Sequence, residues 1–405
     1  PDNGTAMDVA EAVQVAETIG YPVIVRPSYV LGGRAMKIVY DPTALQNFTR
    51  LAIQASPGHP ILIDKFLEDA VEVDVDAISD GQRTVIGGIM EHVEEAGIHS
   101  GDSACILPPR SIPSVVLDEI AAATCAMAAE LNVVGLMNVQ YAIKGDRVFV
   151  LEVNPRASRT VPFVSKATNV PLAKATARVM LGASIAELRA EGLLPATGDA
   201  RTLPADGPVA VKEAVMPFNK FPGVDPILGP EMKSTGEVMG IDMDFGSAFA
   251  KAQLGAHQRL PLQGSVFISV RDRDKPAAAD LAQRFVELGF GIISTRGTAD
   301  FLKARGIPAR FVYKFSTGRP HVVDAIKNRE IQMVVNTGSG DETKRDGYEI
   351  RRAALKFHLP YATTVAGAKA MCDGVAALKG RRLEVMSLQE YHQQLKTQAG
   401  QRLAG

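Results

Sequence analysis

The chain has 405 residues, of which 46% are hydrophobic and 22% are charged. This length is enough for two or three domains with buried cores, and the composition excludes a disordered or fibrous chain. Its 44 Lys and Arg nearly balance its 45 Asp and Glu, which gives no support to a protein that coats nucleic acid or a membrane surface. No apolar run approaches the roughly 20 residues that span a bilayer. The three cysteines lack the CxxC spacing of a zinc site and do not indicate a disulfide framework. We therefore expect a cytoplasmic protein with no nucleic-acid or membrane partner.

The first half of the chain alternates predicted helices with predicted strands. Apolar spacing predicts helices over residues 6–19, 43–55, 113–131 and 170–194. Short β-rich runs predict strands over residues 21–30, 36–40, 59–67, 72–80, 83–93, 136–143 and 147–153. Turns at Gly32-Gly33 and at Lys144-Gly145-Asp146 predict two hairpins. Residues 195–262 are expected to hold short strands and a helix near 246–254, and the start at Pro1, ahead of a predicted helix, indicates a fragment.

The second half changes character after a polar stretch at residues 255–264, which we interpret as a linker. Strands predicted over 265–270, 289–295, 309–314, 331–337 and 360–364 alternate with helices over 275–288, 298–305, 320–328, 342–357 and 366–379. This alternation predicts a parallel, doubly wound sheet, so the expected fold class is α/β and α+β. Residues 383–405 are polar with a little helical character and are expected to form a frayed tail.

The usual nucleotide-binding and hydrolytic motifs are absent from the sequence. It contains no GxxxxGK[ST] loop, and no GxGxxG stands between a predicted strand and a predicted helix. HExxH and GxSxG are also absent. A nucleotide, if the protein binds one, must be held by another scheme.

The hairpin at residues 136–154 carries the most informative polar pattern. Asn138 and Gln140 share one face of the first strand, and Glu152 and Asn154 share one face of the second. Oxygen donors of this kind are the ligands that Mg²⁺ and Mn²⁺ prefer. Two nearby guanidinium groups suit an anionic, phosphate-bearing reaction centre and belong to Arg156 and Arg159. The alternative is a half-exposed hairpin whose polar residues face water.

Two further segments allow a structural and a functional interpretation. Glu72, Asp74 and Asp76 share one face of a predicted strand and form either a solvated acidic edge or, through Glu72, a ribose-binding group. The Gly32-Gly33-Arg34 turn is either a plain turn or a place where backbone N–H groups approach phosphates.

A long polar loop lies between His92 and His99, whose spacing is not that of metal ligands. The two imidazoles are interpreted as structural groups, although long polar loops between strands tend to be functional.

In the second half, candidate anion-binding groups lie at the carboxyl ends of predicted parallel strands, the edge where doubly wound sheets bind ligands. They are Lys275, the run Ser294-Thr295-Arg296-Gly297-Thr298, Lys314, and Asn336-Thr337. The alternative for the Ser and Thr residues is ordinary helix capping.

Long strings in these segments resemble the carboxy-terminal half of the large subunit of carbamoyl phosphate synthetase. The resemblance runs nearly without a break from about residue 18 to 382. It includes VRPSYVLGGRAM, DAVEVDVDAISDG, GGIMEHVEEAGIHSGDSA, GLMNVQYAIK, LEVNPRASRTVPFVSKATNVPLAK and PFNKFPGVDPILGPEMKSTGEVMG. It implies an ATP-grasp domain with helical and β extension over residues 1–256. A methylglyoxal-synthase-like allosteric domain is implied over residues 257–405.

The resemblance also implies roles for single residues in the phosphorylation of carbamate by ATP, a reaction of pyrimidine and arginine biosynthesis. Arg26, Gly32 and Gly33 would contact or cover the phosphates, Asp64, Lys65 and Leu67 would lie at the adenine hinge, and Glu72 would hold the ribose. Gly97, Ile98, His99 and Ser100 would line the nucleotide, and Gln140, Glu152 and Asn154 would hold Mg²⁺ or Mn²⁺. Potassium is a further candidate cation. Arg156 and Arg159, with Asn154, would stabilise the carbamate and the transferred phosphoryl group.

Effector sites are implied as well. An ornithine-class site would use Glu94, Asp102, Glu213, Tyr361 and Thr363, and a uridylate or inosinate site would use Lys275, Thr295, Thr298, Lys314 and Asn336. Gly338 stands where enteric-type members show a second threonine, which leaves the identity of the nucleotide effector open. Methylglyoxal synthase activity is not expected, because residues 316–320 read STGRP where that enzyme has a Gly-Gly-Asp-Gln stretch.

Relative to the family, the chain lacks the pre-ATP-grasp segment with its phosphate-binding arginine, the amino-terminal half and the glutaminase small subunit. We therefore expect a fragment that folds but has little or no overall synthetase activity. Two other hypotheses remain open. One is an ATP-grasp enzyme that phosphorylates bicarbonate or another carboxylate, as biotin-dependent carboxylases do, although the allosteric tail argues against it. The other is a module that only binds effectors.

Overall fold

The computed structural model describes residues 1–30, 32–199, 207–221, 223–337 and 341–394, and the chain divides into two units. The first unit comprises residues 1–205 and 228–234, and the second comprises residues 206–227 and 235–405. Each unit is described by itself. No helix among the described residues is both long enough and apolar enough to cross a membrane.

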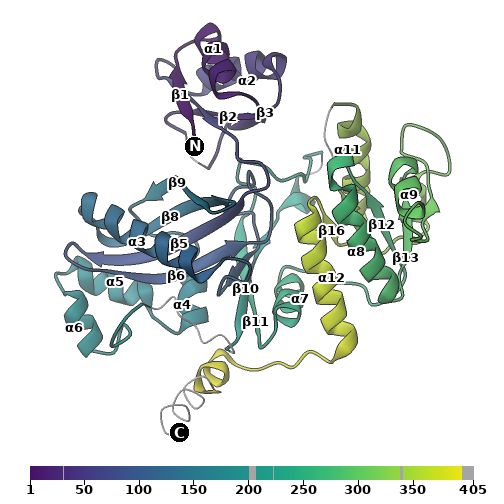
Figure 1. The fold of residues 1–405 in the computed structure, drawn as a ribbon. Coiled ribbons are helices and arrows are strands. Elements are labelled where there is room, and N and C mark those ends of the chain that lie inside the picture. Colours follow the sequence, from purple (N-terminus) through teal and green to yellow (C-terminus); the bar gives the residue numbers. More distant parts are fainter. Residues whose placement is uncertain (31, 200–206, 222, 338–340, 395–405) are drawn as a thin grey trace. The chain divides into compact units, whose positions relative to one another are not determined.

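The first unit begins with a four-stranded antiparallel sheet (Figure 1). Its strands are β1 (Asn3–Ala6), β4 (Ile61–Lys65), β2 (Val23–Pro27) and β3 (Lys37–Val39), in that order across the sheet. Helices α1 (Val9–Ile19) and α2 (Pro42–Ala55) pack their apolar faces on it. Each begins at an aspartate, Asp8 or Asp41, whose side chain accepts hydrogen bonds from N–H groups of the first turn. The predicted helix over 6–19 is therefore wrong at its start, where β1 pairs with β4 instead.

A second antiparallel sheet forms the larger part of the first unit. Its strands in this unit lie in the order β7 (Cys105–Leu107), β6 (Thr84–His92), β5 (Val71–Asp80), β8 (Val134–Lys144) and β9 (Arg147–Asn154). Val73, Val75 and Ala77 of β5 belong to a core shared with α3 (Ser114–Glu130). Helices α4 (Val161–Thr168) and α5 (Leu172–Met180) pack on the opposite face of the sheet, and α6 (Ile185–Ala190) follows them. The hairpin around Gly145 is confirmed, whereas β7 and α4 were not predicted.

The second unit contains the parallel sheet that the sequence predicts. Strands β14 (Arg310–Phe311), β13 (Gly291–Ser294), β12 (Ser265–Ser269), β15 (Met333–Asn336) and β16 (Tyr361–Ala362) follow one another across the sheet, and every pairing is parallel. The connecting helices are α8 (Lys275–Glu287), α9 (Arg296–Lys303), α10 (Val322–Lys327), α11 (Asp341–Lys356) and α12 (Val365–Gly380). A short 3₁₀ helix, η2 (Asp272–Asp274), precedes α8.

The strands β10 (Val209–Val215) and β11 (Gly236–Asp242) form an antiparallel pair in the same unit, with η1 (Phe218–Lys220) between them and α7 (Phe245–Gly255) after them. Helix α7 packs closely on α12, since a Cβ at Gly246 would lie 2.6 Å from the carbonyl oxygen of Asp373. This packing places the unit boundary earlier in the chain than the boundary predicted after residue 256. The division into domains at residues 1–256 and 257–405 stays a prediction.

The polar tail is partly ordered. Residues 388–394 are helical, and Tyr391 is 3% exposed, with its hydroxyl accepting a hydrogen bond of 2.9 Å from Nζ of Lys251. The prediction of a frayed tail is therefore wrong for these residues, because one aromatic side chain anchors them on the unit. Residues 395–405 lie outside the described part of the chain.

Candidate functional site

Two rows of polar side chains cross strands β5, β8 and β9 of the first unit. In the strand register, Asp74 lies opposite Gln140, which lies opposite Glu152. One step along, Asp76 lies opposite Asn138, which lies opposite Asn154. Side chains alternate along a strand, so these rows share the face opposite to the one that packs on α3. The structure thus brings together the four hairpin residues that the sequence placed on one face.

Burial changes steeply across these rows. Asp74 and Asp76 are 1% and 0% exposed, because β5 is an interior strand between β6 and β8. Gln140 and Asn154 are half-buried, and Glu152, on the outer strand β9, is exposed. The interpretation of the acidic strand as a solvated edge is therefore wrong. The two buried carboxylates on β5 therefore lie next to the more accessible oxygen donors of β8 and β9, which are Gln140, Glu152 and Asn154.

Asp76 is held by three hydrogen-bond donors. Asn138 Nδ2 and Ser158 Oγ donate to its Oδ1 at 2.9 and 2.7 Å, and Thr160 Oγ1 donates to its Oδ2 at 2.6 Å. Burial raises the pKa of Asp76 to about 6, although these hydrogen bonds oppose the shift. No local sequence pattern predicts this network. Its signal is weak, since only long-range pairing reveals that the strand is central.

The raised pKa of Asp76 predicts a loss of stability with rising pH. The folded state binds the Asp76 proton more tightly than the unfolded chain does, since the folded pKa is about 6 and the unfolded pKa is about 3.9. Protonated Asp76 therefore adds up to about 3 kcal/mol to the free energy of unfolding below about pH 4, and this contribution is lost as the pH rises through about 6. We expect denaturant unfolding at pH 4 to 7 to show this decline in the wild type and not in Asp76→Asn.

A neighbouring carboxylate provides the control for that measurement. Hydrogen bonds from the backbone of Ile185, Arg83 and Gln82 outweigh burial and lower the pKa of Asp80. The stability that Asp80 contributes is therefore lost only as the pH falls below about 4, and Asp80→Asn should leave the decline between pH 4 and 7 unchanged. Equal slopes for the wild type and Asp76→Asn would contradict the prediction.

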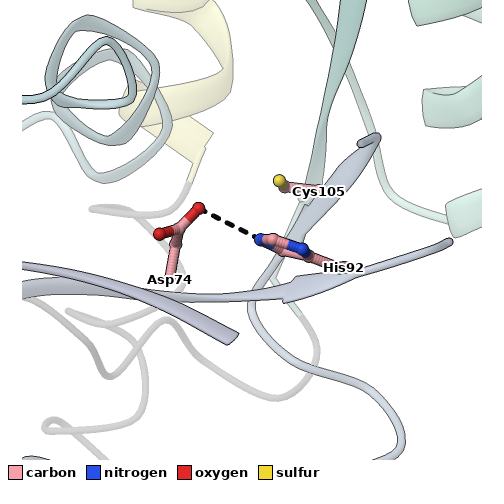
Figure 2. Close-up of side chains that lie close together, drawn as sticks. All are labelled: Asp74, His92 and Cys105. Carbon is pink, nitrogen blue, oxygen red and sulfur yellow. Dashed lines mark hydrogen bonds and ion pairs between the residues drawn. The ribbon is translucent and has the colours of Figure 1, made fainter. Parts of the chain in front are cut away.

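Figure 2 shows a second buried group, formed by Asp74, His92 and Cys105 on β5, β6 and β7. His92 Nε2 lies 3.0 Å from Asp74 Oδ2, and the three candidate ligand atoms lie within 4.8 Å of one another. Burial alone would lower the pKa of His92, but Cys105, Asp74 and Glu72 together raise it well above its usual value. All three side chains are buried, and the Asp74–His92 pair already satisfies Nε2 of the imidazole. We therefore interpret the group as a structural link between the strands.

The loop at residues 97–102 lies against the polar rows. Gly97 N donates to Glu72 Oε1 at 2.9 Å, and Gln140 Nε2 donates to Ser100 Oγ at 2.8 Å. Gly97 has φ +98°, and a Cβ there would lie 2.8 Å from Ile38 and 2.9 Å from the ring of Phe66, so glycine is required. Of the residues predicted in this loop, Ile98 is half-buried, and burial lowers the pKa of half-buried His99.

The two predicted arginines lie beyond the end of β9 and are exposed. Arg156 NH2 donates to Asn154 Oδ1 at 3.0 Å, and Arg159 NH1 donates to Ser234 Oγ at 3.2 Å. Ser234 belongs to the segment 228–234, which returns to the first unit.

The same segment contacts the glycine loop. Met232 N donates to the carbonyl oxygen of Gly32 at 3.0 Å. A Cβ at Gly33 would lie 2.0 Å from the carbonyl oxygen of Pro230, so only glycine fits there. The predicted phosphate-covering loop and Arg159 therefore contact one common segment.

The remaining predicted nucleotide residues lie in or just beyond the small sheet. Arg26 NH1 on β2 lies 3.3 Å from Asp64 Oδ2 on β4. Lys65 Nζ donates to the carbonyl oxygens of Gly20 and Tyr21, both at 2.9 Å, and Leu67 is half-buried after β4.

The predicted nucleotide-effector residues gather at one edge of the parallel sheet. Thr295 Oγ1 lies 2.7 Å from Ser269 Oγ, and Asn336 Nδ2 donates to the carbonyl oxygen of Ser269 at 3.1 Å. Lys275 Nζ lies beside the first turn of α9, which contains Thr298, and Lys314 is half-buried after β14. Thr295 caps no helix N–H with its side chain, so the capping alternative is wrong for it. Gly338 lies outside the described residues.

A buried arginine and a half-buried aspartate form an ion pair beside this edge. Arg351 on α11 is 2% exposed and donates from Nε and NH2 to the two carboxylate oxygens of Asp225, at 2.8 and 2.7 Å. Its NH1 donates to Asn336 Oδ1 at 3.3 Å. Arg351 thus ties the segment before residue 228 to a predicted effector residue.

The residues predicted for an ornithine-class effector fall in both units. In the first unit, Glu94 accepts a hydrogen bond from Ala104 N at 2.7 Å, and Asp102 accepts bonds from Lys233 N and Ser234 N, both at 2.8 Å. In the second, Glu213 accepts a bond from Gln253, burial raises the pKa of Tyr361, and Thr363 is half-buried.

Comparison with known proteins agrees with this geometry. A family model for the carbamoyl-phosphate synthase L chain, ATP binding domain, matches residues 2–188, and a model for an MGS-like domain matches residues 277–363. The chain thus resembles the large chain of carbamoyl phosphate synthase, with an ATP-binding domain of that chain followed by an MGS-like domain. The predicted fold class, an ATP-grasp domain followed by a parallel-sheet, MGS-like domain, is thereby confirmed.

Relatives match nearly the whole of this chain. It is 55% identical to the carbamoyl phosphate synthase large chain of Archaeoglobus fulgidus, over 97% of this chain and 36% of the relative. It is 51% identical to the C-terminal section of the Methanocaldococcus jannaschii large chain, over 98% of this chain and 64% of that section. The chain thus spans about a third of a full-length large chain.

Among solved structures, the biotin carboxylase domain of Hydrogenobacter thermophilus 2-oxoglutarate carboxylase matches with 15% identity and a TM-score of 0.49, over 62% of this chain and 60% of that one.

Proposed function

We propose that the first unit binds ATP with a divalent cation and phosphorylates carbamate to carbamoyl phosphate. The observation that carries the proposal is the pair of rows on β5, β8 and β9, in which Gln140 lies opposite Glu152 and Asn138 opposite Asn154. Arg156 and Arg159 follow shortly after the end of β9 in the sequence. The family model for an ATP-binding domain covers these residues, and the synthase names of the relatives support the choice of acceptor.

The donor set fits Mg²⁺ or Mn²⁺. Glu152 supplies an exposed carboxylate, and Gln140 and Asn154 supply amide oxygens on the same face, which is the hard oxygen chemistry that these ions prefer. A bound ion would neutralise charge on the β- and γ-phosphates. Potassium stays a candidate for which no residue of the site argues specifically.

In the proposed reaction, a carbamate oxygen attacks the γ-phosphorus of ATP and the bond from that phosphorus to the β–γ bridging oxygen breaks, which releases ADP. The protein's contribution is to position the groups and to balance their charge. Arg156 and Arg159 would bind the carbamate and the transferred phosphoryl oxygens, and Arg26, Gly32 and Gly33 would hold the phosphates. Glu72 and the 97–100 loop would bind the ribose, with Asp64, Lys65 and Leu67 at the adenine hinge.

We also propose regulation and partners for the chain. The gathering of Lys275, Thr295, Thr298 and Asn336 at the carboxyl edge of a parallel sheet supports a nucleotide effector of the uridylate or inosinate class, with Lys314 as a further contact. An ornithine-class effector is proposed on the resemblance alone. The glutaminase small subunit and the remainder of the large chain are the proposed partners, in a cytoplasmic enzyme.

The test is a pair of measurements on the 405-residue chain. Calorimetry should detect ADP binding that requires Mn²⁺, and ADP with carbamoyl phosphate should yield ATP by reversal of the proposed step. Absence of ADP binding with and without Mn²⁺ would overturn the proposal. Binding of uridine or inosine monophosphate without any nucleotide turnover would favour the module that only binds effectors. The carboxylase-like alternative would be favoured if the chain phosphorylated bicarbonate with ATP but did not transfer a phosphoryl group from carbamoyl phosphate to ADP.

A further inference from the structure

We propose that the buried carboxylate of Asp76 is a positioning residue, which holds the loop bearing Arg156 and Arg159 in place against the sheet. The inference rests on the proposed function, because the two arginines matter only if they bind the reacting groups. Asp76 itself lies in the buried row on β5 and is 0% exposed.

Two side chains of the loop from residue 155 to 160 anchor it on Asp76. Ser158 Oγ donates to Oδ1 at 2.7 Å and Thr160 Oγ1 donates to Oδ2 at 2.6 Å, so the two oxygens of one carboxylate fix two residues of the loop. Ser158 and Thr160 also lie within 2.8 Å of each other, which closes a ring of hydrogen bonds. Arg159 lies between these two anchors in the sequence.

The carboxylate is in turn fixed by the sheet. Asn138 Nδ2 on β8 donates to Asp76 Oδ1 at 2.9 Å, and β8 also carries Gln140 of the proposed cation site. Through Asp76, the loop is therefore connected to the same strand that carries Gln140 of the proposed cation site. A rigid link of this kind sets the distance between the guanidinium groups and the proposed cation site, on which charge stabilisation depends.

The end of the Arg159 side chain has a separate restraint, which provides a comparison. Its NH1 donates to Ser234 Oγ at 3.2 Å, and Ser234 is 6% exposed. Ser234→Ala removes this hydrogen bond and leaves the guanidinium its contact with Met232 Sδ at 3.1 Å, while the loop stays anchored. Asp76→Ala releases the loop itself. The two substitutions therefore separate the loop anchor from the contact at the end of the side chain.

The first measurement is hydrogen exchange of the backbone amides of residues 156–160. We expect exchange at least about tenfold faster in Asp76→Ala than in the wild type, because local opening then breaks two fewer hydrogen bonds. In Asp76→Asn the amide oxygen can still accept hydrogen bonds from Ser158 and Asn138, and the amide NH2 group can donate one to Thr160 Oγ1. This variant should therefore show the slow amide exchange of the wild type. Ser234→Ala should leave exchange of these amides unchanged. The double variant Ser158→Ala/Thr160→Val removes the same two hydrogen bonds from the loop side, and its amides should exchange as fast as those of Asp76→Ala. It provides the measurement if Asp76→Ala folds poorly.

The second measurement is ATP formation from ADP and carbamoyl phosphate. Asp76→Ala should lower kcat by about 100-fold, the cost of a small displacement of reacting groups, with Kd for ADP within about threefold of the wild type. Adding Ser158→Ala/Thr160→Val to Asp76→Ala should cause no further loss. The inference would be overturned if amide exchange in Asp76→Ala were unchanged, or if Asp76→Asn were impaired as much as Asp76→Ala. It would also be overturned if Asp76→Ala lost affinity for ADP in proportion to its loss of kcat. Failure of the wild type to bind ADP would instead refute the proposed function, and the exchange measurement would still decide whether Asp76 anchors the loop.

Discussion

Replacement of Glu152 by glutamine is expected to lower phosphoryl transfer between carbamoyl phosphate and ADP by about 100-fold or more. Glu152 is the carboxylate of the proposed cation site, and it lies opposite Gln140 on the exposed side of the hairpin. Glutamine keeps the size of the side chain and one oxygen, but it removes the negative charge that attracts the ion. A bound divalent ion contributes several kcal/mol to phosphoryl transfer, so weakening its binding at fixed concentration carries a loss of this size.

The dependence on the metal makes the test specific. We expect Glu152→Gln to need a higher Mn²⁺ concentration than the wild type for half-maximal ADP binding, whereas neither protein should bind ADP after removal of divalent ions with EDTA. Glu130→Gln, at the exposed end of α3 and outside the site, is the matched control and should retain the wild-type metal dependence. The same Mn²⁺ dependence in Glu152→Gln and the wild type would exclude Glu152 as a ligand.

The parts of this site that could be predicted from the sequence depend on local rules. Alternation along a strand and the turn at Gly145 are enough to place Asn138, Gln140, Glu152 and Asn154 on one face, and the register agrees. In the second unit, strand–helix alternation likewise predicts the parallel sheet, because a parallel pair requires a crossover connection. Both predictions use information within a few residues of each position.

The parts that were missed depend on pairing between distant segments. The acidic strand at residues 71–80 is as polar as an edge strand, and Asp76 is buried only because β6 and β8 flank it and Thr160, far along the chain, donates to it. Strand β1 has four residues and little β propensity, and it forms by pairing with β4, more than fifty residues later. Ser234 could not be assigned to the site, because its segment follows a connection whose path no local pattern indicates.

The resemblance to a family supplied what local rules could not, namely an assignment of roles. It assigned Arg156 and Arg159, already paired from their place after the hairpin, to the carbamate and the transferred phosphoryl group. The structure separates the two arginines by their contacts. Arg156 bonds to Asn154 within its own segment, whereas Arg159 reaches Ser234 in another. A guanidinium held by a distant segment is the better oriented of the two for a fixed anion. We therefore expect Arg159 to carry more of the effect on phosphoryl transfer.

Replacement of Arg159 by methionine is accordingly expected to lower phosphoryl transfer by about 1000-fold, within the range known for arginines that stabilise a transferring phosphoryl group. Methionine retains much of the side-chain volume and removes the charge and all donors. Arg159→Lys should recover part of the loss, since it restores charge without the planar fork. Affinity for ADP should change little, because the proposed contacts are to the carbamate and the transferred group.

The control for Arg159→Met is Arg178→Met on α5. Arg178 is also exposed and hydrogen-bonded, through its ion pair of 2.7 Å with Glu191, and such surface pairs contribute little to stability. Arg178→Met removes the same charge from the molecule and should retain wild-type transfer, which separates a local effect of Arg159 from a change in net charge. A loss below about tenfold in Arg159→Met would contradict direct contact with the transferred group, because removal of one oriented donor from a charge-stabilising site costs at least about 100-fold. Equal losses in Arg159→Met and Arg159→Lys would show that the fork geometry, rather than the charge, stabilises the phosphoryl oxygens.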